Sequence, residues 1–226
     1  MINRLPRWVW IGGCALAVIA GMINAAGYLG FRHQAITHMT GTTSLLGIAT
    51  GQGDPGELLH FGGVLLAFVA GCALSGLIVG DSTLRLGRRY GVALMLESVL
   101  LFLAVPLLHA HHDAGLWLAA MACGLQNAMA STYSGAVVRT THVSGITTDL
   151  GMYLGQWLRG STIDLRRVRL YCVLFLGFLG GGIASALAFP HWQERTLLLP
   201  AALTGLVGIA YAGYAHRQRL RAQQED

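Results

Sequence analysis

Long runs of apolar residues dominate the chain, and the stretches between them hold most of its polar and charged residues. A membrane-spanning helix needs roughly 20 apolar residues to cross a hydrocarbon core of about 30 Å. Six runs reach this length, at about 8–30, 61–80, 91–109, 115–136, 170–189 and 196–216. The pattern predicts an all-α polytopic membrane protein with six transmembrane helices.

Two shorter segments, 37–52 and 141–158, carry the same polar motif. "THMTGTTSLLG" (37–47) and "THVSGITTDLG" (141–151) share six identities in eleven positions. The helical part of the first, Thr40–Gly51, would rise only about 18 Å, which is too short to cross. The second contains Asp149, which is costly against lipid. We therefore expect both segments to enter the membrane and return on the same side.

The basic residues test this topology, because cytoplasmic loops of membrane proteins are enriched in arginine and lysine. If both short segments crossed, nine arginines would be cytoplasmic and six external. If neither crosses, only Arg32 and Arg195 are external and thirteen are cytoplasmic. The thirteen are Arg4, Arg7, Arg85, Arg88, Arg89, Arg139, Arg159, Arg166, Arg167, Arg169, Arg217, Arg219 and Arg221. The stronger bias favours six spans, two re-entrant segments and cytoplasmic termini.

The similarity between the two halves extends beyond this motif. "GMINA" (21–25) matches "GLQNA" (124–128), and "AFVAGCALSG" (67–76) is similar to "GFLGGGIASA" (177–186). We expect one membrane domain made of two repeats, 1–110 and 111–226. Each repeat crosses three times, so the second is inverted relative to the first. This 3+3 inverted repeat is an architecture of many secondary transporters.

Three stretches resemble the signature sequences of a known family. They are "THMTG", "GLQNA" and "VRTTHVSGITTDLG" (138–151), and the similarity covers about residues 8–216. They resemble the YoaK-like family of bacterial inner-membrane proteins, which is a domain of unknown function. The resemblance implies a multi-pass protein of the bacterial inner membrane and says little about a substrate.

The repeated motif also predicts a binding site. Extended chain would lead into each half-helix, with Thr40 or Ser144 as the N-cap. The two N-termini would face each other near the midplane, where their free N–H groups favour an anion or a polar acceptor. By analogy of fold alone, transporters of nucleobases and inorganic anions pair half-helices in this way. The expected lining residues are His38, Thr40, Gly41, Thr42, His142, Ser144, Gly145 and Thr147.

The two histidines have two readings. Because histidine titrates near neutral pH, they could bind the solute or relay protons. They could also tie the extended chain to a neighbouring helix. Two roles are likewise possible for the polar side chains in otherwise apolar spans, Asn24, Gln126 and Asn127. They could contact the solute, or they could pair with the interrupted backbone.

Three charged residues are candidates for coupling transport to protons. Glu97 lies in the middle of a span, Asp149 lies in the second half-helix, and Arg139 precedes it. Ionisable groups inside a membrane are often functional. The alternative is structural: either carboxylate could pair with Arg139 or with the backbone.

Composition narrows the function further. The chain is 54% hydrophobic and 11% charged, and its net charge of +5 is spread between apolar blocks, so we expect no nucleic-acid partner. The four cysteines are isolated, and "HAHHD" (109–113) reads as a polar loop rather than a metal site. No nucleotide-binding or hydrolase motif occurs, so we expect no cofactor, no metal and no enzymatic activity.

The leading hypothesis is a small secondary transporter of a polar or anionic solute, embedded in the lipid bilayer and coupled to protons. A passive channel on the same scaffold is the main alternative. A membrane accessory protein or an intramembrane enzyme is a second alternative, although no nucleophile accompanies the motif histidines. A chain of this size is expected to form a homodimer.

Overall fold

The chain folds entirely into helices in the part that the structure describes. The computed structural model describes residues 7–30, 32–80, 88–134 and 140–225. The helices are α1 (Arg7–Leu29), α2 (Met39–Gln52), α3 (Pro55–Val79), α4 (Arg88–His109), α5 (Asp113–Ser134), α6 (Val143–Leu158), α7 (Leu165–Trp192), the short 3-10 helix η2 (Gln193–Leu197) and α8 (Leu198–Glu225). The predicted all-α class is confirmed.

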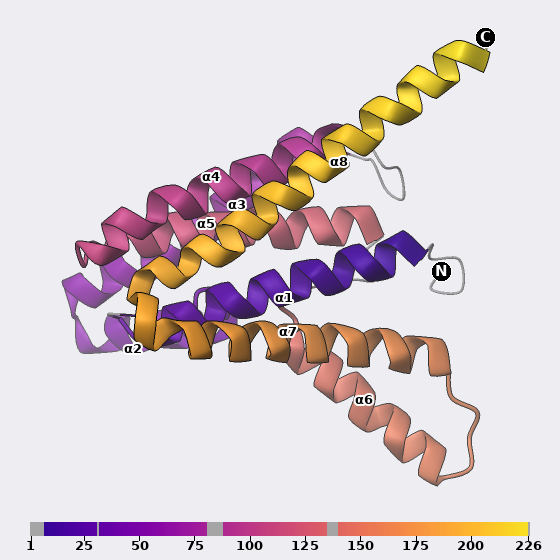
Figure 1. Cartoon of the computed structure of the whole chain (residues 1–226). Helices are drawn as coiled ribbons and strands as arrows, with labels where there is room; N and C mark the ends of the chain where they lie inside the picture. Colours follow the sequence, from indigo (N-terminus) through magenta and orange to yellow (C-terminus); the bar gives the residue numbers. More distant parts are fainter. Residues whose placement is uncertain (1–6, 31, 81–87, 135–139, 226) are drawn as a thin grey trace.

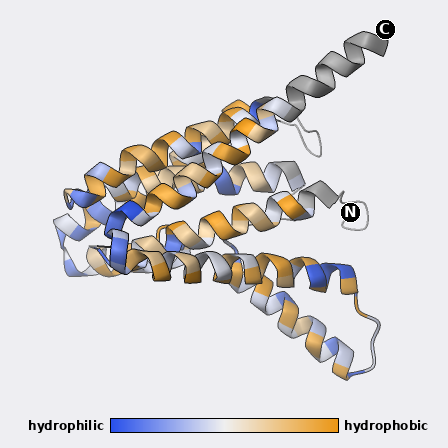
Figure 2. Ribbon diagram, in the orientation of Figure 1, coloured by the Kyte–Doolittle hydropathy of each residue, from blue (hydrophilic) through white to orange (hydrophobic). Residues whose placement is uncertain are grey.

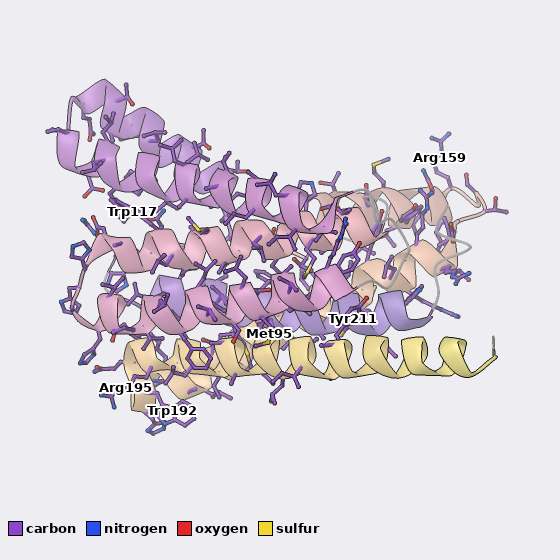
Figure 3. The ribbon with its side chains drawn as sticks, turned by 90° about the horizontal axis from the view of Figure 1, so that it is seen from above. Met95, Trp117, Arg159, Trp192, Arg195 and Tyr211 are labelled. Atoms are coloured by element: carbon purple, nitrogen blue, oxygen red, sulfur yellow. The ribbon has the colours of Figure 1, made fainter. Side chains whose placement is uncertain are left out.

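Six of these helices are long and run along a common bundle (Figure 1). The other two, α2 with 14 residues and α6 with 16, are the shortest α-helices described. They lie towards opposite ends of the bundle (Figure 1). We call these the Arg32 end, where α1 ends and α2 returns, and the Arg159 end, where α6 ends. In Figure 3, Trp117, Trp192 and Arg195 lie at the Arg32 end and Arg159 lies at the other.

Glycines allow α1 and α7 to pack with their backbones in direct contact. A Cβ atom added at Gly21 of α1 would overlap the backbone carbonyl of Phe178 in α7. One added at Gly181 of α7 would overlap the carbonyl of Val18 in α1. Small residues that permit this approach are typical of helix pairs in membranes, where no hydrophobic effect drives helices together.

The pair α3 and α5 packs in the same way. A Cβ atom at Gly71 of α3 would overlap the carbonyl of Met121 in α5. One at Gly124 of α5 would overlap the carbonyl of Phe68 in α3. The helices α4 and α8 form a third extensive pair, in which the Ser98 hydroxyl donates to the Ala201 carbonyl at 2.8 Å.

The outer surface of the bundle is apolar in the way expected for contact with lipid. Leu66 is 71% exposed, Leu77 82% and Leu187 72%, which would be unfavourable in water. Figure 2 shows apolar residues along the helices and polar residues gathered towards the ends. The molecule is therefore a helical membrane protein.

Four stretches of the described residues are long and apolar enough to cross a membrane. They are Trp10–Leu29, Pro55–Val79, Arg89–His109 and the 49-residue stretch Leu165–Gly213, which contains α7, η2 and α8. The helix α5 is not among them. It is as long as a spanning helix but carries several polar side chains in its C-terminal half.

Two helices begin earlier than the apolar runs predict. The Asp54 side chain accepts hydrogen bonds from the N–H groups of Gly56 and Glu57, so α3 begins at Pro55 rather than near residue 61. Asp164 caps α7 in the same way, so that helix begins at Leu165 rather than near residue 170. An aspartate N-cap satisfies the free N–H groups of the first turn and therefore extends the helix into polar sequence.

Candidate functional site

The two short helices begin at the repeated motif, but not at the predicted caps. The helix α2 starts at Met39 and α6 at Val143, so the N-cap residues are His38 and His142. The prediction of Thr40 and Ser144 as caps is wrong, because both lie inside the first turn. No side-chain hydrogen bond caps either helix, and the first-turn N–H groups therefore keep their capacity to donate.

An asparagine on the preceding long helix holds each entry to a short helix. The Oδ1 atom of Asn24 in α1 accepts from the Thr37 N–H at 3.1 Å and from the Thr37 hydroxyl at 2.9 Å. In the second half, Asn127 Oδ1 of α5 accepts from the Thr141 hydroxyl at 3.2 Å. Asn24 thus pairs with the interrupted backbone at Thr37, whereas Asn127 contacts a side-chain hydroxyl.

These contacts also place the two N-termini along the bundle. Asn24 lies more than one helical turn before the end of α1 at Leu29, and Asn127 lies almost two turns before the end of α5 at Ser134. The chain after each long helix therefore turns back alongside it. Both short helices therefore begin within the length of the bundle and not at its ends.

The motif histidines lie close to the glycines of the first turn. A Cβ atom at Gly145 would overlap the His142 ring, whereas one at Gly41 would lie 4.0 Å from Nδ1 of His38. Gly145 therefore lets the His142 ring lie against the first turn of α6. Both histidines are exposed to the surroundings of the protein.

The motif hydroxyls are used mainly inside their own helices. The Thr147 hydroxyl donates to the Val143 carbonyl at 2.8 Å, and Thr42 donates to the His38 carbonyl at 3.3 Å. Thr42 is buried, while Thr40 and Ser144 are exposed. Thr40 and Ser144 are therefore the better placed of the four to meet a ligand.

Gln126 contributes a buried amide in the middle of α5. Its Oε1 atom lies 3.5 Å from the Thr140 hydroxyl, and both residues are almost completely buried. Its Nε2 atom has no hydrogen-bond partner among the described residues. Such a group needs a partner, because an unpaired buried donor is unfavourable by about 1–3 kcal/mol.

The predicted coupling residues occupy different places. Glu97 is fully buried in α4, and neither carboxyl oxygen has a hydrogen-bond partner among the described residues. Asp149 is half-buried in α6 and interacts with the Tyr171 hydroxyl of α7. Arg139 lies outside the described residues. The structure thus separates the two carboxyl groups by helix and by environment.

The two short helices do not touch each other in the part of the chain that the structure describes. No contact joins α2 to α6 within the described chain. Whereas α2 packs closely on α3, α6 diverges from α7 (Figure 1) and leaves an open cavity of about 550 Å³. Leu150, Tyr153, Trp157, Ile163 and Val168 line much of it.

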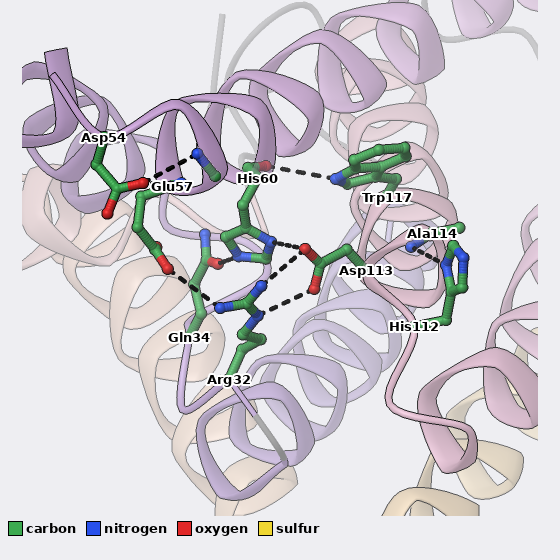
Figure 4. A network of polar contacts seen from close by, with 10 residues as sticks. Arg32, Gln34, Asp54, Glu57, His60, His112, Asp113, Ala114 and Trp117 are labelled. Atoms are coloured by element: carbon green, nitrogen blue, oxygen red, sulfur yellow. Dashed lines mark hydrogen bonds and ion pairs between the residues drawn. The ribbon is translucent and has the colours of Figure 1, made fainter.

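A polar network at the Arg32 end was not predicted (Figure 4). Arg32 binds both carboxyl oxygens of Asp113, with two N–O distances of 2.9 Å, and Glu57 at 3.1 Å. The buried His60 of α3 lies 3.1 Å from Asp113 through Nδ1 and 2.6 Å from Gln34 through Nε2. The network joins the connection after α1 to α3 and α5.

The charges of this network favour ionisation of its partners. The hydrogen bonds that Arg32 donates to Asp113 raise the pKa of Arg32, and the charges of Asp113 and Glu57 act in the same direction. Burial opposes ionisation of Asp113, but the hydrogen bonds and charge of Arg32, together with the nearby His60, outweigh it, so the pKa of Asp113 is lowered.

Two sequence signals pointed towards this network. Arg32 is one of only two arginines predicted to be external, and Asp113 is the last residue of "HAHHD". The loop reading is correct for 110–112, but Asp113 begins α5 and pairs with Arg32. Within the described residues no three histidine, cysteine or carboxylate side chains gather as a metal site would require.

The sequence match to a known family covers most of this helical bundle. Residues 12–210 match the family described as "Protein of unknown function (DUF1275)". The chain belongs to the DUF1275 family. The predicted relation to YoaK-like proteins is confirmed, since the match contains both short helices and all the long ones except the ends of α1 and α8.

A relative of this DUF1275 chain is a bacterial transmembrane protein. The chain is 25% identical over 203 residues to the UPF0700 transmembrane protein YoaK of Bacillus subtilis (strain 168). The aligned region covers 83% of this chain and 87% of the relative. No solved structure matches. The relative is described as a transmembrane protein, in agreement with the apolar surface of the bundle.

Proposed function

We propose that this protein is a small secondary transporter of the bacterial inner membrane, which binds a polar or anionic solute at the N-termini of α2 and α6. One observation carries the proposal. Two short helices with the same motif begin within the bundle, and no side chain caps either one. Uncapped N-termini offer several N–H donors and a partial positive charge to an anion or an acceptor-rich solute.

Re-entry of both short segments is supported by the asparagine contacts. Thr37 lies beside Asn24 and Thr141 lies beside Asn127, in each case before the preceding long helix ends. Non-helical backbone is tolerated at membrane depth only where protein buries it or where it lines a cavity. The six long helices would then be the crossings, including the less apolar α5.

Inverted repeats of three crossings each are supported by matched helix contacts. The contact of Gly21 with the Phe178 carbonyl joins α1 to α7, and the contact of Gly124 with the Phe68 carbonyl joins α5 to α3. The first crossing of each unit thus packs on the second crossing of the other. Because each unit crosses three times, such an arrangement relates the units by a two-fold axis in the membrane plane.

The positive-inside rule gives the orientation. Arg159 lies at one end of the bundle and Arg195 at the other (Figure 3). Placing the Arg159 end in the cytoplasm puts both termini there and leaves only Arg32 and Arg195 outside. Under this orientation the cavity between α6 and α7 opens to the cytoplasm and the Arg32 network lies on the external side.

The difference between the two short helices suggests a state of a transport cycle. The helix α2 is packed against α3, whereas its counterpart α6 has diverged from α7. In an inverted-repeat transporter such a difference between the units gives access to the site from one side. The structure would then correspond to a cytoplasm-facing state. If α6 packed on α7 and α2 moved away from α3, the site would open to the external side.

Glu97 and Asp149 are the proposed groups that link transport to protons. Glu97 is fully buried without a hydrogen-bond partner among the described residues, an environment that favours the neutral acid. Asp149 connects α6 to Tyr171 of α7, so a proton there would weaken the contact between the diverging helices. Separate Glu97→Gln and Asp149→Asn variants would show which carboxyl group makes uptake depend on the pH gradient.

Flux into proteoliposomes tests the proposal. Radiolabelled sulfate, phosphate, bicarbonate and uracil would be offered separately, with and without an imposed pH gradient. A transporter should show saturable uptake of at least one of these, enhanced by the gradient. Conductance that does not saturate would instead identify a passive channel. If none of the four probes enters proteoliposomes faster than it enters protein-free liposomes, the result would count against a site for small anions or nucleobases.

Matched glycine variants connect the flux to the short helices. Gly145→Ala places a methyl group where the His142 ring lies, and so should reduce uptake at least tenfold. Gly151→Ala in the same helix meets nothing within 4 Å and should leave uptake unchanged. Equal uptake by the two variants would remove the N-terminus of α6 from the mechanism.

A further inference from the structure

The network at the Arg32 end gathers four titratable side chains from three segments of the chain (Figure 4). Arg32 comes from the connection between α1 and α2, Glu57 and His60 come from α3, and Asp113 is the first residue of α5. Arg32, Glu57 and Asp113 are partly exposed, with side-chain exposures of 34%, 39% and 25%, but His60 is only 1% exposed. A histidine buried among charged groups requires an explanation.

Both ring nitrogens of His60 face oxygen atoms that accept hydrogen bonds. Nε2 lies 2.6 Å from Oε1 of Gln34. The Gln34 amide nitrogen donates to the Thr42 hydroxyl at 3.3 Å, and this contact turns the amide oxygen towards His60. A neutral imidazole has one N–H group, and donating it to Gln34 leaves the lone pair of Nδ1 facing the Asp113 carboxylate.

The second contact specifically needs a charged ring. Nδ1 of His60 lies 3.1 Å from Oδ2 of Asp113, which is an ion-pair distance, but the geometry is not that of a hydrogen bond. Attraction there comes mainly from opposite charges. It is therefore strong only when the imidazole carries a proton.

The charge of the surrounding groups points in the same direction. Arg32 supplies one positive charge against the two carboxylates of Glu57 and Asp113. A protonated His60 makes the network neutral, and a neutral His60 leaves one negative charge uncompensated in a partly buried place. Other titratable groups belong to α3 and to the helices packed against it, or to their caps and the adjoining turn: His38, Asp54, Cys72, Arg89, Tyr90, Glu97, His109, His111, His112 and Cys123.

The ring also connects the segments mechanically. His60 reaches α2 through Gln34 and Thr42, and it reaches α5 through Asp113. Its backbone carbonyl accepts from Trp117 Nε1 of α5 at 3.3 Å. Loss of the ring charge would therefore weaken the attachment of α2 and α3 to α5 at this end.

We propose that His60 is a proton-binding site whose charged form locks the Arg32 end of the bundle closed. Binding of a proton to the ring joins α2, α3 and α5 through Gln34 and Asp113, and its release allows these helices to separate. The use of this lock rests on the transporter proposed above, in which the Arg32 end is the external side of the solute path. It assigns the external proton site to a residue outside the repeated motif.

Tryptophan fluorescence tests proton binding without any solute. Trp8, Trp10, Trp157 and Trp192 are replaced by phenylalanine, leaving Trp117 beside His60. We expect a single sigmoidal change of Trp117 emission in a pH titration, because a nearby imidazolium quenches indole fluorescence. His60→Gln should abolish it, and Asp113→Asn should move its midpoint to lower pH by removing the charge that favours the proton.

His112→Gln provides the matched control. This histidine lies at the same end, but its ring accepts from the Ala114 N–H and does not contact His60. It should leave the midpoint unchanged. A transition that persists in His60→Gln, or a midpoint that follows His112 rather than Asp113, would overturn the proposal. If His60→Gln does not fold, the comparison of Asp113→Asn with His112→Gln decides the matter.

Distance measurement tests the lock itself. Spin labels on cysteines at the exposed positions Gln52 and Ala110, in a cysteine-free background, report the separation of α2 from the start of α5. The distance should be longer and more broadly distributed at pH 8 than at pH 5.5, and independent of pH in His60→Gln. A distance that does not change with pH in the parent protein would contradict the lock and leave the transporter proposal standing. Absence of flux would contradict the transporter and leave proton binding by His60 standing.

Discussion

Gly181 of α7 lies directly against the backbone carbonyl of Val18 in α1, with no room between them for a Cβ atom. The contact is one of a matched set that brings α1 to α7 and α3 to α5. Close packing at these points is required for the bundle, since in lipid the association of helices depends on van der Waals contact rather than on burial from water.

Gly181→Ala should therefore destabilise the protein, and Gly180→Ala should not. A methyl group at Gly181 forces the two backbones apart, which is unfavourable by about 1–3 kcal/mol. One at the neighbouring Gly180 meets nothing within 4 Å. Thermal unfolding in detergent compares the two. Equal midpoints would show that the close contact is not required.

Asn24→Ala should weaken the entry into α2. The Thr37 N–H and hydroxyl both lose their acceptor, which is unfavourable by about 1–3 kcal/mol for partly buried groups. Asn127→Ala removes the acceptor of one hydroxyl only, so its effect should be smaller. Unfolding midpoints and protease cleavage within 32–38 measure the difference. A larger effect of Asn127→Ala would contradict the conclusion that Asn24 holds its short helix through more hydrogen bonds than Asn127 does.

Asp113→Asn should flatten the acid dependence of stability. The carboxyl of the unfolded chain titrates near 3.8, and in the folded protein its pKa is lowered. Its contribution is therefore present above about pH 4 and is lost as the pH falls through the folded pKa. We expect the variant to be less stable at pH 6 by about 1 kcal/mol and to lose less on acidification than the parent.

Asp54→Asn serves as the control for Asp113. Asp54 caps α3 at the same end of the bundle, and asparagine caps helices about as well as aspartate. Unfolding midpoints of both variants would be measured from pH 6 to pH 3. A fall in stability for Asp54→Asn equal to that for Asp113→Asn would mean that the loss of any carboxylate at this end has the same effect.

Thiol labelling should locate Gln52 and Pro55 on the external side. Both residues are exposed where α2 passes into α3. With the Arg32 end outside, cysteines at these positions should react with a membrane-impermeant maleimide on intact cells. A cysteine at Ser161, at the other end, should react only after the cells are opened. Labelling of Gln52 from the cytoplasm alone would restore a topology in which the short segments cross.

The residues show why part of the structure could be predicted and part could not. Apolar runs of spanning length are visible in the sequence because lipid demands them. The capping roles of Asp54 and Asp164 could also have been found, since each precedes a helix at a recognisable N-cap position. The sequence places the N-caps of α2 and α6 two residues too late, because threonine and serine are common N-caps whereas the structure has His38 and His142 there.

The site was predicted only as far as local sequence allows. The motif correctly marked where two short helices begin, and Asn24 and Asn127 were singled out because polar side chains are rare in spans. The sequence does not predict the network of Arg32, His60 and Asp113, because its members are separated by tens of residues and no local pattern joins them. Nothing in the sequence of α3 distinguishes His60 from a surface histidine.

The sequence by itself determined the membrane class, the family and the places where the helices are interrupted, because these depend on local polarity and on similarity along the chain. The tertiary structure decided which groups meet. It paired α1 with α7 and α3 with α5 through glycine contacts, buried His60 between Gln34 and Asp113, and left Glu97 without a hydrogen-bond partner among the described residues. Such contacts join residues far apart in the chain, and they depend on how the helices pack rather than on any one segment.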